Sequence, residues 1–386
     1  MDRKTQVSIA KRFLAHLEAG TTDSADSLMS VPVSDYIDRA MWDEEIEQFY
    51  KRKPVVVGLS AELPEVGSFL SVTIVDVPIL ITRTAEGLQA FLNVCRHRGA
   101  QVAPEMCSGR QTRFTCPYHG WTYDNAGKLI GVANAKTFGS FDTATRGLTR
   151  IAVAERCGIV FAVLTPGIEI DIEEWMAGAD VHMGLDNRFE DYTLVGTREV
   201  EAANWKLVVE GHLESYHFAS LHRDSIAPFM VSNCTTFDRF GPHILITFVQ
   251  QHIEKLRDMP EESWEPLKED MINLQYVMFP GTMVVVWQNA IGLQIIQPSK
   301  EPGRSTSRLV YAVRTECLDT EEAVAKANAT LDFNANLVAT EDYVASFQIQ
   351  RGFETAAQSE ILFGKNELGL HLFRQALESQ LPQAAE

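Results

Sequence analysis

Four candidate metal ligands in two short segments constrain the fold of this chain more than any other feature. Cys95 and His97 form a C-x-H pair, and after 18 intervening residues Cys116 and His119 form a C-x-x-H pair. Each pair offers one thiolate and one imidazole, both of which bind transition metals. The chain must therefore fold so that two segments, each carrying one sulfur and one nitrogen ligand, meet at a common centre.

The equal division of ligands favours a [2Fe-2S] cluster in which two cysteines hold one iron and two histidines hold the other. A structural zinc ion with the same four ligands is the alternative. Zinc ligands more often come as C-x-x-C and H-x-x-x-H pairs, so the observed spacing argues against zinc. The six cysteines of this 386-residue chain are better explained as thiols or metal ligands than as a disulfide framework.

The quartet lies in a β-rich part of the sequence. Short runs typical of strands, at residues 54–58, 69–77, 79–82, 88–94 and 159–164, are separated by Gly, Pro and Asp clusters. This pattern predicts an antiparallel all-β module over residues 41–165, which ends near the Pro-Gly pair at 166–167. A helical segment over residues 1–40, of which the first 35 or so look helical, is expected to precede the module and to pack on a larger domain.

Residues 166–386 are predicted to form that larger α+β domain. Helical patterns appear at 172–176, 204–222, 320–350 and 368–377, and a second set of strand patterns runs from 243 to 311. The expected fold class is therefore α+β, with an all-β module inserted before an antiparallel sheet and its helices.

Composition excludes several function classes. The chain has 34 Lys and Arg against 52 Asp and Glu, a formal charge of −18, and an acidic surface repels nucleic acid and anionic membranes. No run approaches the roughly 18 apolar residues of a membrane span, and the N-terminus lacks the apolar core of a signal peptide. We therefore expect a cytoplasmic protein without nucleic acid or membrane partners.

The segments CRHRGA (95–100) and CPYHGWTYDNAGKLIGV (116–132) resemble the Rieske signature of the ring-hydroxylating oxygenase family, in its large (alpha) subunit. Gly99 and Gly120 are expected to let the two loops approach the cluster closely. The resemblance extends over most of the chain. It implies that residues 166–386 form a helix-grip catalytic domain with mononuclear non-haem iron.

A second motif, NWKLVVEGHLESYHFASLH (204–222), resembles the mononuclear iron motif of the same family and implies that His217 and His222 are ligands. Histidines five residues apart point about 140° from each other on an ideal helix, so joint ligation requires a distorted helix. Gly211 stands where Asn is common in the family, and Glu214 stands where Asp is usual. His212 is an additional imidazole, which we expect to pack near the iron rather than to bind it.

The third iron ligand is expected to be a carboxylate from the helix at 320–350, where the family also places it. The candidates are Asp332, Glu341, Asp342 and Glu354. Asp342 is favoured because it lies in the middle of an apolar stripe, where a carboxylate is costly unless a metal or a basic side chain pairs with it. A bridge to a buried Arg or Lys is the alternative. A second apolar stripe, with Phe333 and Val344, predicts a helix buried on two sides.

The resemblance implies a terminal oxygenase that uses O₂ and electrons from NAD(P)H. A separate reductase, with or without a ferredoxin, supplies the electrons, since the chain has no G-x-G-x-x-G dinucleotide fingerprint. The resemblance also implies a homotrimer, with or without small beta subunits, in which Glu214 links His217 to His119 of the next subunit. A non-catalytic electron carrier or ligand-binding protein is the alternative from another class.

The predicted substrate is small and hydrophobic or aromatic, as in aromatic hydrocarbon catabolism, because the candidate pocket residues are apolar and rich in aromatic rings. These residues are Ile226, Phe229, Met230, Phe237, Phe240, Phe279, Met283, Val285, Trp287 and Leu293. The alternative substrate is a quaternary ammonium of the carnitine or betaine type, since aromatic rings also bind such cations. Relatives acting on those compounds tend to have Glu at the position of Glu214.

Overall fold

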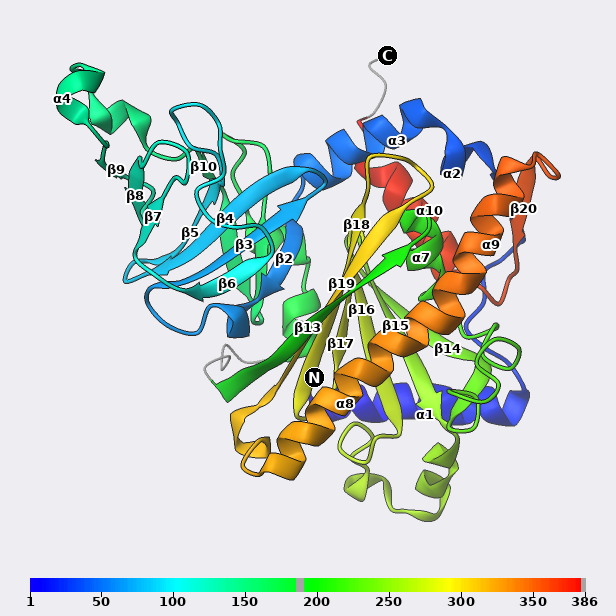
Figure 1. The fold of residues 1–386 in the computed structure, drawn as a ribbon. Helices are drawn as coiled ribbons and strands as arrows, with labels where there is room; N and C mark the ends of the chain where they lie inside the picture. Colours follow the sequence, from blue (N-terminus) through cyan, green and yellow to red (C-terminus); the bar gives the residue numbers. More distant parts are fainter. Residues whose placement is uncertain (185–190, 383–386) are drawn as a thin grey trace. The chain divides into compact units, whose positions relative to one another are not determined.

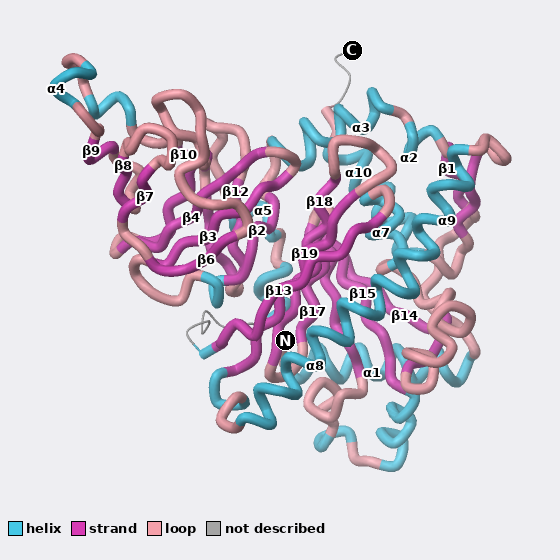
Figure 2. Tube along the Cα trace, in the orientation of Figure 1, coloured by secondary structure: helices cyan, strands magenta, loops and turns pink. Residues whose placement is uncertain are grey.

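The computed structural model describes residues 1–184 and 191–382, which form two compact units (Figures 1 and 2). Glu47–Trp175 is the smaller unit. The larger unit combines Met1–Ile46 with the described residues from Met176 onward. The smaller unit thus interrupts the larger one along the chain, which confirms the predicted α+β organisation with an inserted β module.

The smaller unit is built from three antiparallel sheets, with strand orders β10-β5-β4-β3-β6, β11-β12-β2 and β7-β8-β9. Its strands are β2 (Val55–Leu59), β3 (Ser68–Ile74), β4 (Val77–Thr84), β5 (Gly87–Leu92), β6 (Cys107–Arg110), β7 (Arg113–Thr115), β8 (Thr122–Asp124), β9 (Leu129–Gly131), β10 (Arg150–Ile151), β11 (Val153–Arg156) and β12 (Ile159–Ala162). The five predicted runs each overlap a strand. The other six strands have two to four residues, too few for a period of two to be recognised.

The larger unit is organised around a seven-stranded antiparallel sheet with the order β13-β19-β18-β17-β16-β15-β14. The strands are β13 (Tyr192–Ala202), β14 (Met230–Phe240), β15 (His243–Gln250), β16 (Ile272–Met278), β17 (Thr282–Val286), β18 (Ala290–Pro298) and β19 (Ser305–Arg314). A two-stranded sheet pairs β1 (Met29–Pro32) with β20 (Glu360–Phe363). The two edge strands, β13 and β14, were not predicted, because both carry many polar residues.

Helices surround this sheet (Figure 1). They are α1 (Arg3–Ala19), α2 (Ser34–Ile37), α3 (Arg39–Glu45), α6 (Ala179–Met183), α7 (Trp205–Gly211), α8 (Glu321–Leu337), α9 (Tyr343–Glu354) and α10 (Leu368–Gln380); the short helices α4 (Ala135–Phe138) and α5 (Ile172–Met176) complete the set in the described residues. The Arg12 guanidinium of α1 donates to Asp238 of β14 at 2.9 Å, which fastens the N-terminal helix to the sheet.

Helices α8 and α9 form one long rod across the sheet, joined by the π-helical turn Val338–Asp342 (Figure 1). The rod begins where the Thr320 side chain accepts the Ala323 N–H. Leu331 packs against Leu309 of β19. The expectation of a rod buried on two sides is wrong for this chain, because Phe333 is 55% and Val344 45% exposed.

Two predicted helices end earlier than expected. Helix α1 stops at Ala19, because Gly20 adopts a left-handed conformation (φ +62°) that closes the helix. Helix α7 stops at Gly211, and turns replace the expected helix as far as His222. The Glu214 side chain accepts the backbone N–H groups of Tyr216 and His217, and such local bonds compete with helix formation.

Within residues 1–184 and 191–382, none of the helices combines the length and the apolar character that a bilayer crossing requires.

Candidate metal centres

The two Cys–His segments of the smaller unit fold into loops with the same backbone hydrogen bonds. The Cys95 N–H donates to the Ala100 carbonyl (2.8 Å) and the Gly99 N–H to the Cys95 carbonyl (3.0 Å). Cys116 repeats the pattern with Trp121 and Gly120, at the same distances. Gly99 and Gly120 have φ values of +85° and +69°, which glycine adopts at little cost. Positive φ is therefore the feature that requires glycine in both loops.

The donor atoms of these loops suit a [2Fe-2S] cluster. Cys95 and Cys116 are both 3% exposed, and the His97 and His119 ring centroids lie 4.6 Å apart. The Nδ1 atoms of both histidines are buried and have no hydrogen-bond partner among the described residues. A buried polar atom without a partner is costly, and a metal at these two nitrogens would remove that cost. The two predicted histidines thus lie side by side with their Nδ1 atoms unpartnered among the described residues, and the two predicted cysteines share one buried hydrophobic cluster.

Aromatic side chains surround the loops. The Trp121 ring stacks on His97 at 4.9 Å, and the Tyr123 hydroxyl lies 3.3 Å from Cys95 Sγ. Burial raises the pKa of Tyr123, so its hydroxyl stays protonated and can donate to the sulfur. Hydrogen bonds to cluster sulfurs influence the reduction potential of such centres. Tyr123 was not predicted, and only its place in the CPYHGWTYD segment points to it.

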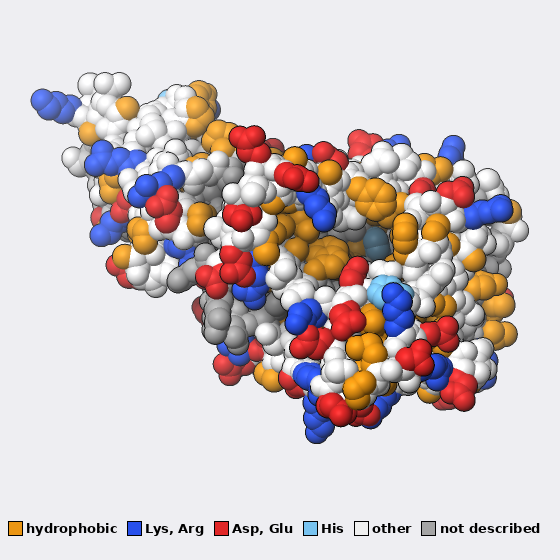
Figure 3. Space-filling model, turned by 90° about the horizontal axis from the view of Figure 1, so that it is seen from below, with side chains coloured by type: hydrophobic (Ala, Val, Ile, Leu, Met, Phe, Trp, Pro, Cys, Tyr) orange, Lys and Arg blue, Asp and Glu red, His pale blue; other side chains and the backbone are white. Residues whose placement is uncertain are grey.

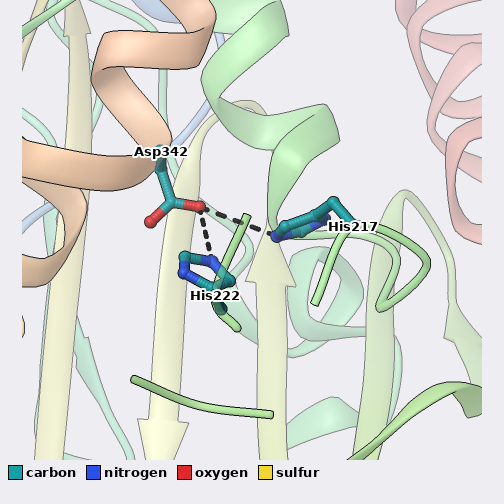
Figure 4. A group of neighbouring side chains, drawn as sticks. All are labelled: His217, His222 and Asp342. Atoms are coloured by element: carbon teal, nitrogen blue, oxygen red, sulfur yellow. Dashed lines mark hydrogen bonds and ion pairs between the residues drawn. The ribbon is translucent and has the colours of Figure 1, made fainter. Parts of the chain in front are cut away.

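A second centre lies in the larger unit, where His217, His222 and Asp342 converge (Figure 4). One donor atom from each lies within 4.8 Å of the others. Asp342 Oδ1 is 3.1 Å from His222 Nε2 and 3.7 Å from His217 Nε2. Two imidazoles and one carboxylate on one side of a metal leave positions open for small ligands, as in non-haem Fe(II) sites.

Two further carboxylates orient the histidines of this centre. Glu214 Oε1 contacts His217 Nδ1, and Glu341 Oε2 lies 2.7 Å from His222 Nδ1. The Ser225 hydroxyl donates to the same Glu341 oxygen at 2.8 Å. With each Nδ1 held by a carboxylate, both Nε2 atoms face Asp342, and this is the usual arrangement around metal-bound histidines. Glu341 therefore orients a histidine, and Asp342 is placed to bind the metal.

The π-helical turn explains how neighbouring residues reach one histidine. It ends at Asp342 and places Glu341 and Asp342 at the two ring nitrogens of His222. Single π turns within α-helices are often found at functional sites. The other carboxylate candidates lie elsewhere: Asp332 pairs with Arg198 at 2.7 Å, and Glu354 approaches Gln350 at 3.4 Å.

His212 lies beside the centre without joining it. Its Nε2 is 2.9 Å from the Gln294 side-chain nitrogen, and burial lowers the pKa of His212 to about 4. The ring is therefore neutral near pH 7, so its Nε2 can accept a hydrogen bond from Gln294. Among the described residues, the metal-binding group at this place comprises only His217, His222 and Asp342.

A cavity of about 220 Å³ adjoins the three residues. Five of the ten predicted pocket residues line it: Ile226, Met230, Val285, Trp287 and Leu293. The other five do not: Phe237, Phe279 and Met283 belong to the core, Phe229 is 62% exposed, and Phe240 packs on the His182 ring at 4.9 Å. Lining residues that were not predicted include Phe218, Phe248, Leu309, Tyr311, Leu331 and Leu337. Figure 3 shows one face of the molecule, with a hollow floored largely by hydrophobic side chains.

The cavity wall follows the register of the sheet. Gln275, Val285, Gly292 and Tyr311 stand opposite one another on four successive strands and share one face. A Cβ at Gly292 would lie 3.1 Å from the Trp287 ring, so the missing side chain leaves room for that indole. Asn273, on the same face, has a buried side-chain oxygen without a partner in the described chain.

Charge is nearly absent from the wall. Among the described lining residues, the acids are Glu214 and Asp342, and no Lys or Arg takes part. The aromatic rings are Phe218, Phe248, Trp287 and Tyr311. The arrangement suits a small uncharged or cationic molecule better than an anion, because a buried anion needs a cationic partner.

Comparisons with known proteins agree with these two centres. Residues 53–142 match the Rieske [2Fe-2S] domain, and residues 189–383 match the ring hydroxylating alpha subunit (catalytic domain). The glycine betaine monooxygenase oxygenase subunit of Pseudomonas aeruginosa is 33% identical over 200 residues, 52% of this chain and 46% of that protein. The match thus spans about half the length of that relative. The anthranilate 1,2-dioxygenase large subunit of Burkholderia cepacia is 29% identical over 83% of each chain.

Solved structures share the fold. A quaternary ammonium Rieske monooxygenase in complex with L-carnitine superimposes with a TM-score of 0.76 at 21% identity, over 93% of this chain and 97% of that one. Naphthalene 1,2-dioxygenase from Rhodococcus sp. bound to indole gives 0.72 at 18% identity, over 98% and 99%.

Proposed function

Because the chain belongs to the ring-hydroxylating alpha-subunit family and carries its Rieske [2Fe-2S] domain, we propose that it is the terminal oxygenase subunit of a multicomponent system. The observation that carries the proposal is the convergence of His217, His222 and Asp342 beside an apolar cavity. A plain electron carrier would need neither this convergence nor the cavity. The cofactors of this family are a Rieske cluster and mononuclear iron, so a structural zinc ion is not needed to explain the Cys–His quartet.

We assign the residues as follows. Cys95, His97, Cys116 and His119 hold the cluster, and His217, His222 and Asp342 hold Fe(II). When bound, the iron supplies the activation of O₂ for hydroxylation, cis-dihydroxylation or oxidative dealkylation. The carboxylates of Glu214 and Glu341 keep the two iron-binding imidazoles in position, and the apolar wall keeps water away from the substrate.

The substrate we propose is a small neutral hydrophobic or aromatic molecule. The described cavity wall offers four aromatic rings and aliphatic side chains but no cation to pair with a carboxylate group. A substrate carboxylate buried there would have no Lys or Arg to pair with and would depend on the metal and the imidazoles for compensation. The second candidate is a quaternary ammonium, which the same rings could bind and which two of the similar proteins act on or bind by name.

The proposed partners follow from the same assignment. Electrons come from NAD(P)H through a separate reductase, with or without a ferredoxin, and the proposed location is the cytoplasm. The catalytic assembly is a homotrimer, with or without small beta subunits. In it Glu214 links His217 to His119 of the neighbouring subunit, so that a cluster in one subunit serves the iron of the next. A head-to-tail contact of this kind closes into a ring.

A substrate panel with a surrogate reductase tests the proposal. The panel contains a neutral bicyclic aromatic, an aromatic carboxylate, choline and glycine betaine, and it follows O₂ uptake together with product mass. We expect coupled uptake with the neutral aromatic and little with the two carboxylates. Coupled turnover of choline or glycine betaine instead would favour the quaternary ammonium alternative. Absence of substrate-dependent O₂ uptake with every compound, in protein containing both metals, would contradict the oxygenase assignment.

A further inference from the structure

A second cavity approaches the proposed iron site from the side of α9. Its volume is about 140 Å³. Five residues border both cavities: Gly211, His212, Glu214, His217 and Asp342. The residues that border only the second cavity are Leu207, Val208, Leu221, Tyr343, Ala345, Ser346 and Ile349. The two spaces therefore meet at the metal-binding side chains and lead away from them along different walls.

The second cavity has little to offer a polar ligand. The Ser346 hydroxyl in its wall already donates to the Tyr343 carbonyl at 3.0 Å. The Tyr343 hydroxyl is engaged by Ser307 and by Gln294, the latter at 2.6 Å. The remaining side chains that border this cavity alone are aliphatic. The acids and imidazoles that border this cavity all lie at its junction with the first one, so its outer part is apolar, and apolar cavities tend to stay dry and bind gases such as xenon.

Gly211 lies at the junction of the two cavities. A Cβ built on this residue would meet no atom within 4 Å, so the junction is open on that side. Gly211 is the last residue of α7 and does not adopt a left-handed conformation, so its backbone does not require glycine. The absence of a side chain here leaves the passage open. The other end reaches the surface at Ile349, which is 45% exposed.

We propose that this second cavity is the entry route of dioxygen, separate from the substrate cavity; the inference rests on the proposed oxygenase function. A substrate of the proposed kind fills most of the roughly 220 Å³ beside the iron-binding residues and blocks that approach. Dioxygen is small, neutral and apolar, and it matches a passage whose outer wall is aliphatic and whose Tyr343 and Ser346 hydroxyls are already engaged. Entry past Ile349, Ala345 and Gly211 brings the gas to the metal-binding side chains while the substrate stays in place.

Xenon identifies the route without turnover. Crystals of the purified protein under xenon pressure should show xenon between Leu221, Ala345 and Ile349, both with and without a bound substrate analogue. Substrate analogue should displace any xenon from the cavity lined by Val285 and Trp287. Xenon confined to that first cavity, or lost from the second when the analogue binds, would overturn the proposal.

Matched substitutions separate the two cavities. Ala345→Phe fills the second cavity, and Ile349→Trp covers its outer end without lying next to Asp342 in the helix. Each variant should lose xenon from the second cavity and show a KM for O₂ raised about tenfold, with substrate affinity and iron content unchanged. The control, Val285→Phe in the first cavity, should weaken substrate binding while keeping xenon in the second cavity and the KM for O₂. An unchanged KM for O₂ in both α9 variants would reject the route.

Failure of the oxygenase function and failure of the gas route give different results. If the wild-type protein containing both metals consumed no O₂ with any substrate, the proposed function would be wrong. If it turned over normally and xenon avoided the second cavity, only the gas route would be rejected.

Discussion

The two proposed metal sites of this chain are built in opposite ways. The cluster ligands come from two loops whose backbones repeat the same hydrogen bonds, and the imidazole Nδ1 atoms of those loops lack partners within the described chain. The iron ligands come from segments about 120 residues apart, and carboxylates hold the Nδ1 atom of each histidine. In the first site the backbone positions the ligands; in the second, neighbouring side chains do.

This difference determines how each site should respond to substitution. A site held by its own backbone loses the metal when a ligand is removed but depends little on neighbouring side chains. A site held by side chains depends on the carboxylates that contact its ligands. Substitution of such a carboxylate typically lowers metal affinity by 10–100-fold. The predictions below test this contrast.

The largest effect is expected for Asp342→Ala. This change removes the carboxylate that His217 and His222 share, so the protein should lose mononuclear iron and substrate oxidation, the latter at least ~10³-fold. Visible and EPR spectra of the cluster should be unchanged, because its ligands lie in the other unit. Iron analysis per chain checks the loss. Normal iron occupancy would move the ligand role to Glu341.

The converse change is Cys116→Ser. The purified variant should be colourless and lack the Rieske EPR signal, because a hydroxyl binds iron far less well than a thiolate. Mononuclear iron should remain, at about one per chain by metal analysis, and turnover should stop for lack of electrons. A variant that kept one zinc ion and no sulfide, as in a zinc site, would contradict the cluster assignment.

Glu214 and Glu341 form a matched pair, because each contacts the Nδ1 atom of one iron-binding histidine. If Glu214 also links to the neighbouring cluster, Glu214→Ala should slow reoxidation of the reduced cluster about 100-fold in single turnover at saturating iron. Glu341→Ala should leave that rate within a few-fold of wild type. Equal rates in the two variants would show that electrons travel by another path.

A smaller effect is expected for Glu341→Gln. The amide oxygen can still accept from His222 Nδ1 and Ser225, but the charge that strengthens the imidazole as a ligand is gone. Fe(II) should bind roughly tenfold more weakly in equilibrium dialysis, near the lower end of the effects seen for such neighbours. Activity should recover when iron is added in excess. Unchanged Fe(II) affinity would show that the charge of Glu341 is not needed.

The same contrast decides how much could be predicted from the sequence. The Cys95–His97 and Cys116–His119 pairs are local, so their spacing favours the cluster over zinc, and the strand patterns around them predict the β module. Asp342 was favoured from an apolar stripe of helical period, and the structure places it between the two histidines. The π-helical turn that brings it there leaves no sequence signal we could use, and neither does the role of Glu341.

The expected helix from 204 to 222 was wrong for a related reason. Helical periodicity continues through the motif, but α7 ends at Gly211, and in the turns that follow the Glu214 side chain accepts the backbone N–H groups of Tyr216 and His217. Only half of the predicted pocket residues line the cavity. Other lining residues, such as Phe248, Leu309 and Tyr311, were missed because strand register brings them to it. Register depends on how strands pair in three dimensions, which one strand's pattern does not specify.

The last predicted effect concerns the backbone of the cluster loops. Gly99 and Gly120 both have positive φ, which costs an L-residue about 1–2 kcal/mol. A Cβ at Gly99 would meet no atom within 4 Å, whereas at Gly120 it would lie 3.1 Å from the Ala133 Cβ. Gly99→Ala should therefore lower the free energy of unfolding of the smaller unit by about 1–2 kcal/mol, and Gly120→Ala by more.

Denaturant titrations that follow the visible circular dichroism of the cluster measure this difference, because the signal reports the smaller unit alone. Gly20→Ala is the control: it has the same kind of positive φ (+62°) and free space for a Cβ, but it lies at the end of α1 in the larger unit. In this variant the cluster signal should be lost at the same denaturant midpoint as in the wild-type protein. An equal loss of unfolding free energy in Gly99→Ala and Gly120→Ala would mean that the loop near Ala133 moves to accept the added Cβ. The backbone would then hold the cluster less rigidly than the repeated hydrogen bonds imply.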